Sequence, residues 1–221
     1  MAQKQKAVVL FSGGVDSTTC LALAIERFGK ENVVPLSIQY GQKHSKELEA
    51  AANVLAYYGI EGKTISNSSL LKQSTEDVPS GSYKEQQDEL GEGPVSTYVP
   101  FRNGLFLSAA ASLALSLDCG YIYYGAHADD AAGNAYPDCT EVFYTSMGNA
   151  IFEGSGKECS LEAPFINCNK ADVVREGLRL GVPYQLTWSC YEGGDHPCGH
   201  CGTCIDRQEA FRANGVEDPA N

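Results

Sequence analysis

Short apolar runs alternate along this chain with longer segments of helical periodicity. The apolar runs predict strands at about residues 6–11, 33–39, 63–66, 121–125 and 160–164. The periodic segments predict helices at about residues 17–28, 44–58, 103–117 and 139–152, and a last helix between Asn169 as N-cap and Gly181. A polar stretch rich in Gly, Pro and Ser, residues 66–97, is typical of a long loop or insert over the active face.

This order of elements predicts a doubly wound α/β fold, a Rossmann-like parallel sheet covered by helices on both faces. We expect the whole chain, residues 1–221, to form a single domain. Ligands of such sheets bind at the carboxyl ends of the strands. The loops that follow the predicted strands are therefore where chemistry is expected.

Composition narrows the classes of function. The chain has 16 basic and 28 acidic residues and a net charge of −12, which argues against a nucleic-acid-binding surface and favours small-molecule substrates. No apolar run has the length of a membrane span. The first residues lead directly into the first predicted strand, with no signal-peptide pattern. We therefore expect a cytoplasmic protein without a membrane partner.

The loop after the first strand, "FSGGVDSTTC", has the features of a phosphate-binding turn. Its glycines allow a tight turn, its hydroxyl groups add donors, and a helix N-terminus follows. A nucleoside-triphosphatase loop has a lysine before its Ser/Thr, but here Asp16 precedes Ser17, which favours holding pyrophosphate as a leaving group. Asp16 is predicted to hold Mg²⁺ or to cap the helix. The candidate nucleotide-binding residues are Leu10, Phe11, Ser12, Gly13, Gly14, Val15, Asp16, Ser17, Thr18, Thr19 and Cys20.

A second candidate loop, "GAHADDAAG", follows the predicted strand at residues 121–125. Gly125 permits a close approach of another group, because it has no side chain. His127, Asp129 and Asp130 are candidates for binding Mg²⁺ or for contacting an activated intermediate.

Four of the nine cysteines lie close together in the sequence, as Cys190, Cys198, Cys201 and Cys204. In a reducing compartment this spacing predicts a closed, structural tetrahedral Zn²⁺ site within a C-terminal segment, residues 188–215. His200 is an alternative to one of the thiolates. The scattered cysteines Cys20, Cys119, Cys159 and Cys168 are expected to be small buried apolar side chains.

Several motifs together carry a resemblance to known proteins. The stretch Ser12–Ser17 matches the SGGxDS signature of the PP-loop ATP pyrophosphatases, which have an adenine nucleotide alpha hydrolase-like fold. The stretches "YGQKHSKELEAA", "STYVPFRNGLFLSAAA", "YPDC", "NKADVV" and "LTWSCYEGG", with the cysteines in order, resemble the 7-cyano-7-deazaguanine synthase (QueC, preQ0 synthase) family. The resemblance extends over residues 6–215.

The resemblance implies a carbon–nitrogen ligase that uses ATP with Mg²⁺ to convert 7-carboxy-7-deazaguanine and ammonia to the nitrile, with one structural Zn²⁺ per chain in a homodimer. It implies catalytic roles for Asp16, Ser17, Arg102 and Asp129. Gly125 and His127 join the nucleotide site. The residues predicted to bind the deazaguanine are Asn103, Tyr136, Asp138 and Cys139.

Two other classes of function remain open from the sequence. One is a PP-loop sulfurtransferase acting on tRNA, in which the cysteines hold an iron–sulfur cluster or carry a persulfide; the net charge of −12 argues against it. The other is a nucleotide-binding module that regulates a partner without catalysis.

Overall fold

The centre of the protein is a parallel sheet with the strand order β3-β2-β1-β4-β5. The computed structural model describes residues 4–40, 46–66, 82, 85, 91, 93–95 and 97–220. The strands are β1 (Ala7–Leu10), β2 (Val33–Gln39), β3 (Lys63–Ser66), β4 (Tyr121–Tyr123) and β5 (Ser160–Glu162). The chain runs outward from β1 to β3 and then returns to β4 on the other side of β1. The predicted doubly wound α/β class is confirmed, and the strand order reverses beside β1, where such folds bind ligands.

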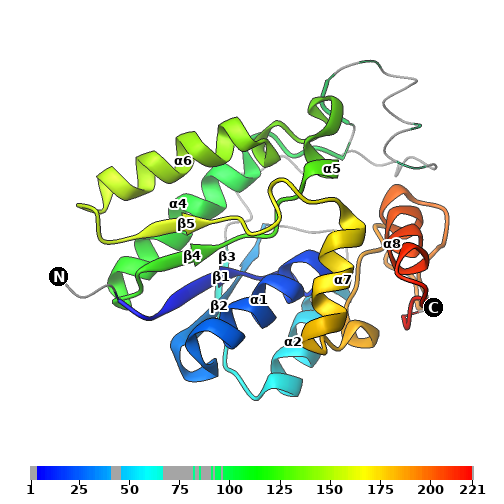
Figure 1. The fold of residues 1–221 in the computed structure, drawn as a ribbon, viewed down its shortest axis with the longest axis horizontal. Coiled ribbons are helices and arrows are strands. Elements are labelled where there is room, and N and C mark those ends of the chain that lie inside the picture. Colours follow the sequence, from blue (N-terminus) through cyan, green and yellow to red (C-terminus); the bar gives the residue numbers. More distant parts are fainter. Residues whose placement is uncertain are drawn as a thin grey trace.

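Helices cover both faces of the sheet (Figure 1). One layer contains α1 (Val15–Phe28), α2 (Lys46–Tyr58) and α7 (Lys170–Leu180), and the other contains α4 (Arg102–Ser116) and α6 (Glu141–Gly154). Strand β1 serves both layers, because successive side chains point to opposite faces. Ala7 and Val9 pack in the core with α1, whereas Val8 packs in the core with α4.

Short helical elements lie in the connections between these strands and helices. They are η1 (Lys30–Asn32), α5 (Ala128–Ala131), η2 (Ala132–Asn134), η3 (Pro137–Cys139) and η4 (Tyr184–Leu186). The stretch around α5 and η3 follows β4 at the carboxyl edge of the sheet, so it carries the second candidate loop to the same edge as the first.

The predicted helices and strands are all present, with bounds shifted by a few residues. Strands β2 and β3 have the predicted limits, whereas β4 and β5 each end two residues earlier than expected. Helix α7 has the predicted caps: Asn169 and Asp172 form a reciprocal capping box, and Gly181 ends the helix in the left-handed region. The expected start of α2 at residues 44–45 and most of the expected insert at 66–97 lie outside the described residues.

The sequence did not predict the last helix, α8 (Gly202–Ala213), which lies beside α7 (Figure 1). Arg207 on α8 is buried and forms a two-pronged ion pair with Asp218, with Nε–Oδ2 and Nη2–Oδ1 distances of 2.6 and 2.9 Å. Its guanidinium also donates to Thr187 and to the Tyr184 carbonyl. This arginine therefore joins the C-terminal tail, η4 and α8 into one unit.

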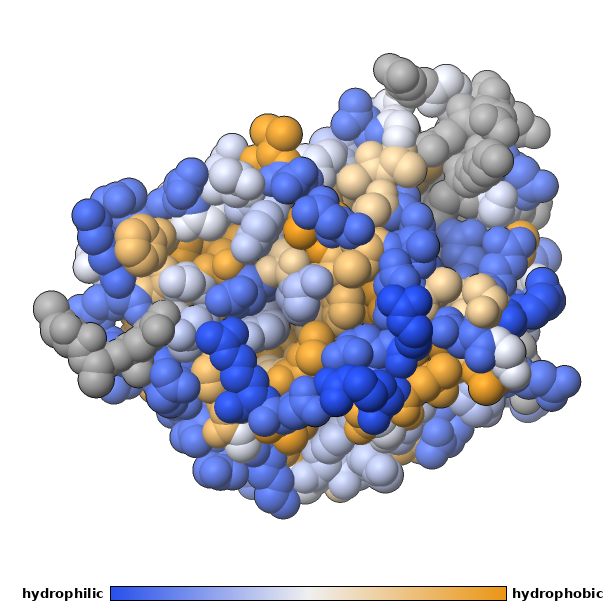
Figure 2. Space-filling model, in the orientation of Figure 1, coloured by the Kyte–Doolittle hydropathy of each residue, from blue (hydrophilic) through white to orange (hydrophobic). Residues whose placement is uncertain are grey.

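Hydrophilic residues cover much of the face seen in Figure 2, and hydrophobic ones show mainly in the band between the two helical layers. Within the described ranges, none of the helices combines the length and the apolar character that crossing a bilayer requires.

Candidate functional site

A cavity of about 300 Å³ lies at the carboxyl ends of β1, β2 and β4. The sequence-predicted residues that line it come from loops far apart in the chain. They are Leu10, Phe11, Ser12, Gly14, Val15, Asp16, Ser17, Arg102, Asn103, Gly125, His127, Asp129, Asp130, Tyr136 and Cys139. The structure thus brings both candidate loops and most of the candidate substrate residues to one cavity.

Five predicted residues lie behind the cavity wall. Thr18, Thr19 and Cys20 are fully buried in α1, and the Thr19 hydroxyl bonds to the Val15 carbonyl and the Tyr184 hydroxyl. Gly13 turns the loop at a φ of +85°, and a Cβ there would lie 2.5 Å from the Ala51 nitrogen in α2. The fifth residue, Asp138, lies in η3 and is described below. None of the five lines the cavity.

The phosphate loop is organised by its two serines. The Ser12 and Ser17 hydroxyls lie 3.1 Å apart, and the Gly14 N–H donates to the Ser12 hydroxyl at 3.3 Å. Gly14 is the N-cap of α1 and has no side chain to occupy the first N–H groups of the helix. Those groups have no intrahelical partner, so they can donate to an anion in the cavity.

Asp16 is the second residue of α1, so the prediction that it caps the helix is wrong; Gly14 does so. The Asp16 carboxylate instead forms an ion pair with Lys170, whose Nζ lies 2.5 Å from Oδ2. Burial would raise the pKa of Asp16, but the Lys170 ammonium and the nearby His127 outweigh it and hold this pKa below its usual range. The lysine missing from the loop is therefore present in the cavity, supplied by the first residue of α7.

His127 is buried between two carboxylates. Its Nε2 lies 3.4 Å from Asp130 Oδ2 and 3.7 Å from Asp16 Oδ1. Neither ring nitrogen, nor Asp16 Oδ1, has a hydrogen-bond partner among the residues that the structure describes. Burial, together with the negative charges of Asp16 and Asp129, raises the pKa of Asp130. Buried polar atoms without partners cost free energy, so this pocket is suited to a bound cation or ligand, and the two carboxylates are oxygen ligands of the kind that Mg²⁺ prefers.

Two other predicted carboxylates accept hydrogen bonds from helix N-termini. Asp129 Oδ2 accepts from the Lys170 N–H at the start of α7, at 2.7 Å. Asp138 Oδ2 accepts from the Asn103 N–H at the start of α4, at 2.8 Å. Both are favourable positions for an anion. Asp129 still lines the cavity, whereas Asp138 is buried behind it.

Arg102 is at the centre of a second group of cavity residues, in which aromatic rings predominate. Its Nη1 donates to the Tyr40 hydroxyl at 3.2 Å. The pKa of Cys139 is raised by burial, which keeps its thiol protonated, and the Asn103 amide donates to its sulfur at 3.2 Å. The Tyr136 hydroxyl bonds to the Thr97 hydroxyl at 2.7 Å.

Glu47, from the first turn of α2, lines the same cavity and was not predicted from the sequence. Burial raises the pKa of Glu47, and the charge of Arg102 opposes this rise. No hydrogen bond or ion pair connects its carboxylate to the other described residues. Its carboxylate is an acceptor in the wall of the cavity.

The C-terminal segment adds five more lining residues that the sequence did not indicate: Trp188, Ser189, Tyr191, Thr203 and Asp206. The backbone N–H of Trp188 donates to the Gly13 carbonyl at 3.1 Å, and this hydrogen bond attaches the segment to the phosphate loop. Burial and neighbouring acidic groups raise the pKa of Asp206 to about 6, although Lys170 opposes the shift.

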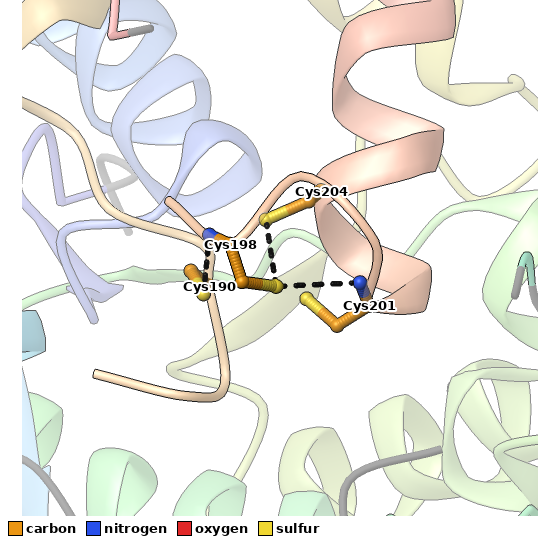
Figure 3. A group of neighbouring side chains, drawn as sticks. All are labelled: Cys190, Cys198, Cys201 and Cys204. Carbon is orange, nitrogen blue, oxygen red and sulfur yellow. Dashed lines mark hydrogen bonds between the residues drawn. The ribbon is translucent and has the colours of Figure 1, made fainter. Parts of the chain in front are cut away.

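The sulfur atoms of Cys190, Cys198, Cys201 and Cys204 all lie within 4.8 Å of one another (Figure 3). A tetrahedral ion with bonds of about 2.3 Å holds its sulfurs about 3.8 Å apart, and Cys198 Sγ is 4.0 Å from Cys204 Sγ. The backbone N–H of Cys201 donates to Cys198 Sγ at 3.3 Å, and that of Cys198 donates to Cys190 Sγ at 3.4 Å. A hydrogen bond from the Cys204 thiol lowers the pKa of Cys201. The group therefore fits one metal ion that prefers thiolates.

The remaining cysteines are free thiols. Cys20, Cys119 and Cys159 are buried as expected, and Cys168 is partly exposed. Burial raises the pKa of the Cys20, Cys119 and Cys159 thiols, so these three behave as apolar side chains.

The sheet order and the Ser12–Ser17 loop at its carboxyl edge define an ATP-using α/β domain of the PP-loop class. The family profile described as "Queuosine biosynthesis protein QueC" matches residues 6–215. The chain belongs to this family.

Several relatives named 7-cyano-7-deazaguanine synthase are similar to this chain over nearly their whole length. A 7-cyano-7-deazaguanine synthase of Archaeoglobus fulgidus is 41% identical over 97% of this chain and 89% of its own. The enzyme of the same name from Caldicellulosiruptor saccharolyticus is 43% identical, over 97% of this chain and 94% of its own. That of Oceanobacillus iheyensis is 41% identical over 97% of both chains.

Two solved structures are similar in fold. The NH3-dependent NAD synthetase of Campylobacter jejuni, in complex with the nitrate ion, has a TM-score of 0.52 and 19% identity, over 97% of this chain and 77% of its own. The U34-tRNA thiolase NcsA of Methanococcus maripaludis, with its [4Fe-4S] cluster, has a TM-score of 0.53 and 16% identity. The match covers 85% of this chain and 61% of the thiolase. At these identities the likeness concerns the fold alone.

The Asp16–Lys170 pair yields a prediction about stability. Removing one partner of a fully buried pair costs about 3–5 kcal/mol, and we expect about 2 kcal/mol for Lys170→Met, because the Asp16 side chain is 26% exposed. The double variant Asp16→Asn/Lys170→Met should recover part of this loss, measured as the free energy of unfolding in urea at pH 7. Because the pair depresses the pKa of Asp16, the stability it contributes should disappear as the pH falls below about 4.

Arg175→Met is the matched control, because Arg175 lies on the same helix and makes an exposed ion pair with Asp172. Such a pair contributes less than about 1 kcal/mol. The coupling of Asp16 to Lys170 would be contradicted if Lys170→Met and Arg175→Met lost the same free energy of unfolding. It would also be contradicted if the double variant recovered none of the loss.

Proposed function

We propose that this protein is an ATP-dependent carbon–nitrogen ligase that converts 7-carboxy-7-deazaguanine and ammonia to 7-cyano-7-deazaguanine, or preQ0. The observation that carries the proposal is a single cavity lined both by the Ser12–Ser17 phosphate loop and by the polar and aromatic group around Arg102. The names of the relatives supply the identity of the substrate. The cavity supplies a place for a triphosphate beside a planar, carboxylate-bearing heterocycle.

The reaction removes two oxygens from one carbon, and each needs a good leaving group. Transfer of AMP to the substrate carboxylate releases pyrophosphate, and attack by ammonia then releases AMP and gives the amide. Transfer of a second AMP to the amide oxygen releases another pyrophosphate. Loss of AMP and the remaining N–H proton then forms the C≡N bond. Two activations by one phosphate loop therefore account for both dehydrations.

The residues around the loop divide this work. The Ser12 and Ser17 hydroxyls and the first N–H groups of α1 hold the departing pyrophosphate. The Lys170 ammonium neutralises charge that develops on the phosphates. It comes from the start of α7 and not from the phosphate loop itself. Asp16 and Asp130, rather than Asp129, are the carboxylates whose surroundings best fit Mg²⁺; when bound, this ion screens the negative charge of the triphosphate.

The group around Arg102 orients the heterocycle. We assign the substrate carboxylate to the Arg102 guanidinium, which matches a carboxylate in charge and geometry. We assign the Glu47 carboxylate to the edge of the deazaguanine that carries the ring N–H and the 2-amino group, because two neighbouring donors suit its two oxygens. Tyr136 and Cys139 contribute to the pocket wall, whereas Asn103 and Asp138 hold that wall in place.

We propose that the four cysteines hold one structural Zn²⁺ per chain. The separation of their sulfurs suits one ion, whereas a four-iron cube would hold its thiolates farther apart because it occupies the space between them. A closed Cys₄ site has no position left for a substrate, so its role is to hold the segment that carries Trp188, Thr203 and Asp206.

The tRNA sulfurtransferase is the weaker proposal, because the relatives carry the synthase name and the net charge is −12. For the synthase we expect small-molecule substrates only and, from the family resemblance, a homodimer.

The first test of the proposed function is the nucleotide balance. With 7-carboxy-7-deazaguanine, ammonia and ATP, we expect about two AMP and two pyrophosphate per nitrile, because each of two oxygens needs its own activation. At limiting ATP the primary amide should accumulate, and added ATP should convert it to the nitrile. Chromatography of nucleotides and deazapurines measures both. ADP and phosphate as the only nucleotide products would contradict the mechanism, and turnover that needs tRNA and a sulfur donor would contradict the assignment.

The second test concerns Glu47. A hydrogen bond to a charged group contributes about 1.5–3 kcal/mol, so Glu47→Gln should raise the KM for the deazapurine about tenfold or more and leave the KM for ATP unchanged. An analogue without the 2-amino group should bind the wild type weakly and show no further loss in the variant. Glu49→Gln, an exposed position on the same helix, is the control. A rise in the KM for ATP instead would place Glu47 at the nucleotide.

The third test concerns the metal. Elemental analysis of the purified chain should find one zinc per chain. Structural zinc contributes on the order of 10 kcal/mol to folding, so Cys201→Ser should give insoluble or zinc-free protein. Cys168→Ser, at a partly exposed thiol outside the cluster, should keep its zinc and serves as the control. Normal folding and full zinc content in Cys201→Ser would refute the four-cysteine site.

A further inference from the structure

A second group of metal-ligating side chains adjoins the four cysteines. Glu192, Cys198 and His200 have ligand atoms that all lie within 4.8 Å of one another, and Cys198 belongs to both groups. In Figure 3 dashed lines join the Cys198 sulfur to the Cys204 sulfur and to the Cys201 nitrogen, so this sulfur belongs to the four-cysteine group. The two groups therefore meet at one sulfur atom.

Exposure increases from one group to the other. Cys190, Cys201 and Cys204 are buried, Cys198 is partly exposed, and the Glu192 and His200 side chains are 42% and 57% exposed. Glu192 and His200 are thus reached directly from solvent, and they lie beside the Cys198 sulfur, which belongs to the buried group.

The hydrogen bonding of His200 prepares it to bind a cation. Its Nδ1 lies 3.3 Å from the Cys198 carbonyl oxygen, which can only accept, so Nδ1 carries the proton of this bond. The other ring nitrogen, Nε2, lies 3.1 Å from Glu192 Oε1. A ring nitrogen and a carboxylate oxygen, both common metal ligands, therefore lie side by side at the exposed end of the group. A histidine that donates from one nitrogen to a carbonyl and binds metal through the other is a common arrangement in metal sites.

We propose that Glu192, His200 and Cys198 form an entry site that takes Zn²⁺ from solution and passes it to the four-cysteine site. This inference rests on the proposed zinc site and is independent of the reaction in the cavity. The Glu192 oxygen, His200 Nε2 and the Cys198 thiolate would hold the arriving ion first. The thiolates of Cys190, Cys201 and Cys204 would then replace the carboxylate and the imidazole, while Cys198 would remain a ligand throughout. The thiols release their protons to solvent, and no electron is transferred.

An entry site changes the rates of metal exchange in both directions and leaves the final affinity unchanged. As a surface ion pair alone, Glu192–His200 would contribute less than about 1 kcal/mol to stability and nothing to zinc exchange. As structural ligands, the two residues would instead change the affinity. The three roles are therefore distinguished by measuring rates and equilibrium together.

The test uses the zinc-loaded full chain. We expect His200→Gln and Glu192→Gln to slow both zinc release to excess EDTA and exchange with added ⁶⁷Zn²⁺ several-fold, because each variant removes one of the three ligands of the entry site. The zinc content and the dissociation constant from chelator competition should stay at the wild-type values. His196→Gln, another exposed histidine of the same loop, is the matched control and should exchange like the wild type.

Unchanged exchange rates in both variants would overturn the proposal and leave the pair as a surface contact. Faster release with weaker affinity would overturn it in favour of structural ligands. Wild-type protein without zinc would overturn it together with the zinc site, while synthase turnover, measured separately, tests the proposed function on its own.

Discussion

The arrangement of the site depends on the ion pair between Asp16 and Lys170, which joins the N-termini of α1 and α7 at the carboxyl edge of the sheet. Neither charge is well placed without the other. A carboxylate beside a phosphate cradle repels the ligand, and a lysine in the first turn of a helix opposes the helix dipole. Paired, they neutralise each other, and Asp129 further satisfies the N–H of Lys170. The pair thereby places an ammonium group in the cavity beside the N-terminus of α1.

Much of the fold could be predicted from local pattern, because strand runs such as residues 33–39 and caps such as Asn169 and Gly181 are set by neighbouring residues. Lys170 could not be placed in this way, since 154 residues separate it from Asp16. Helix α8 escaped prediction for a different reason. Its buried side includes Cys204 and Arg207, a metal-ligand candidate and a charge, so the apolar stripe that marks a helix is incomplete. The ion pair with Asp218 replaces the missing apolar contact.

In the candidate site, too, some residues could be predicted from local sequence and others depend on distant neighbours. The glycines and serines of the phosphate loop are recognisable because a tight turn before a helix needs those residue types at those positions. Carboxylates carry no such signal, since an aspartate serves equally as a helix cap, a metal ligand or a base. Asp138 and Asp129, both predicted to meet ligands, each accept a helix N–H group, and Asp129 does so from the cavity wall. Only the tertiary neighbours decide between these roles, which is also why Glu47 had no distinguishing feature in the sequence.

The cysteine segment is built into the site rather than attached beside it. Cys190 faces the sulfur cluster, while its neighbours Ser189 and Tyr191 line the cavity; on α8, Cys204 faces the cluster and Thr203 and Asp206 face the cavity. The backbone N–H of Trp188 donates to the Gly13 carbonyl, so a hydrogen bond joins the phosphate loop to the same segment. Any ion that fixes the four sulfurs also fixes the backbone from Trp188 to Asp206. A metal bound by the four sulfurs would thus act on the cavity through the position of the Ser12–Ser17 loop, without itself lining the cavity.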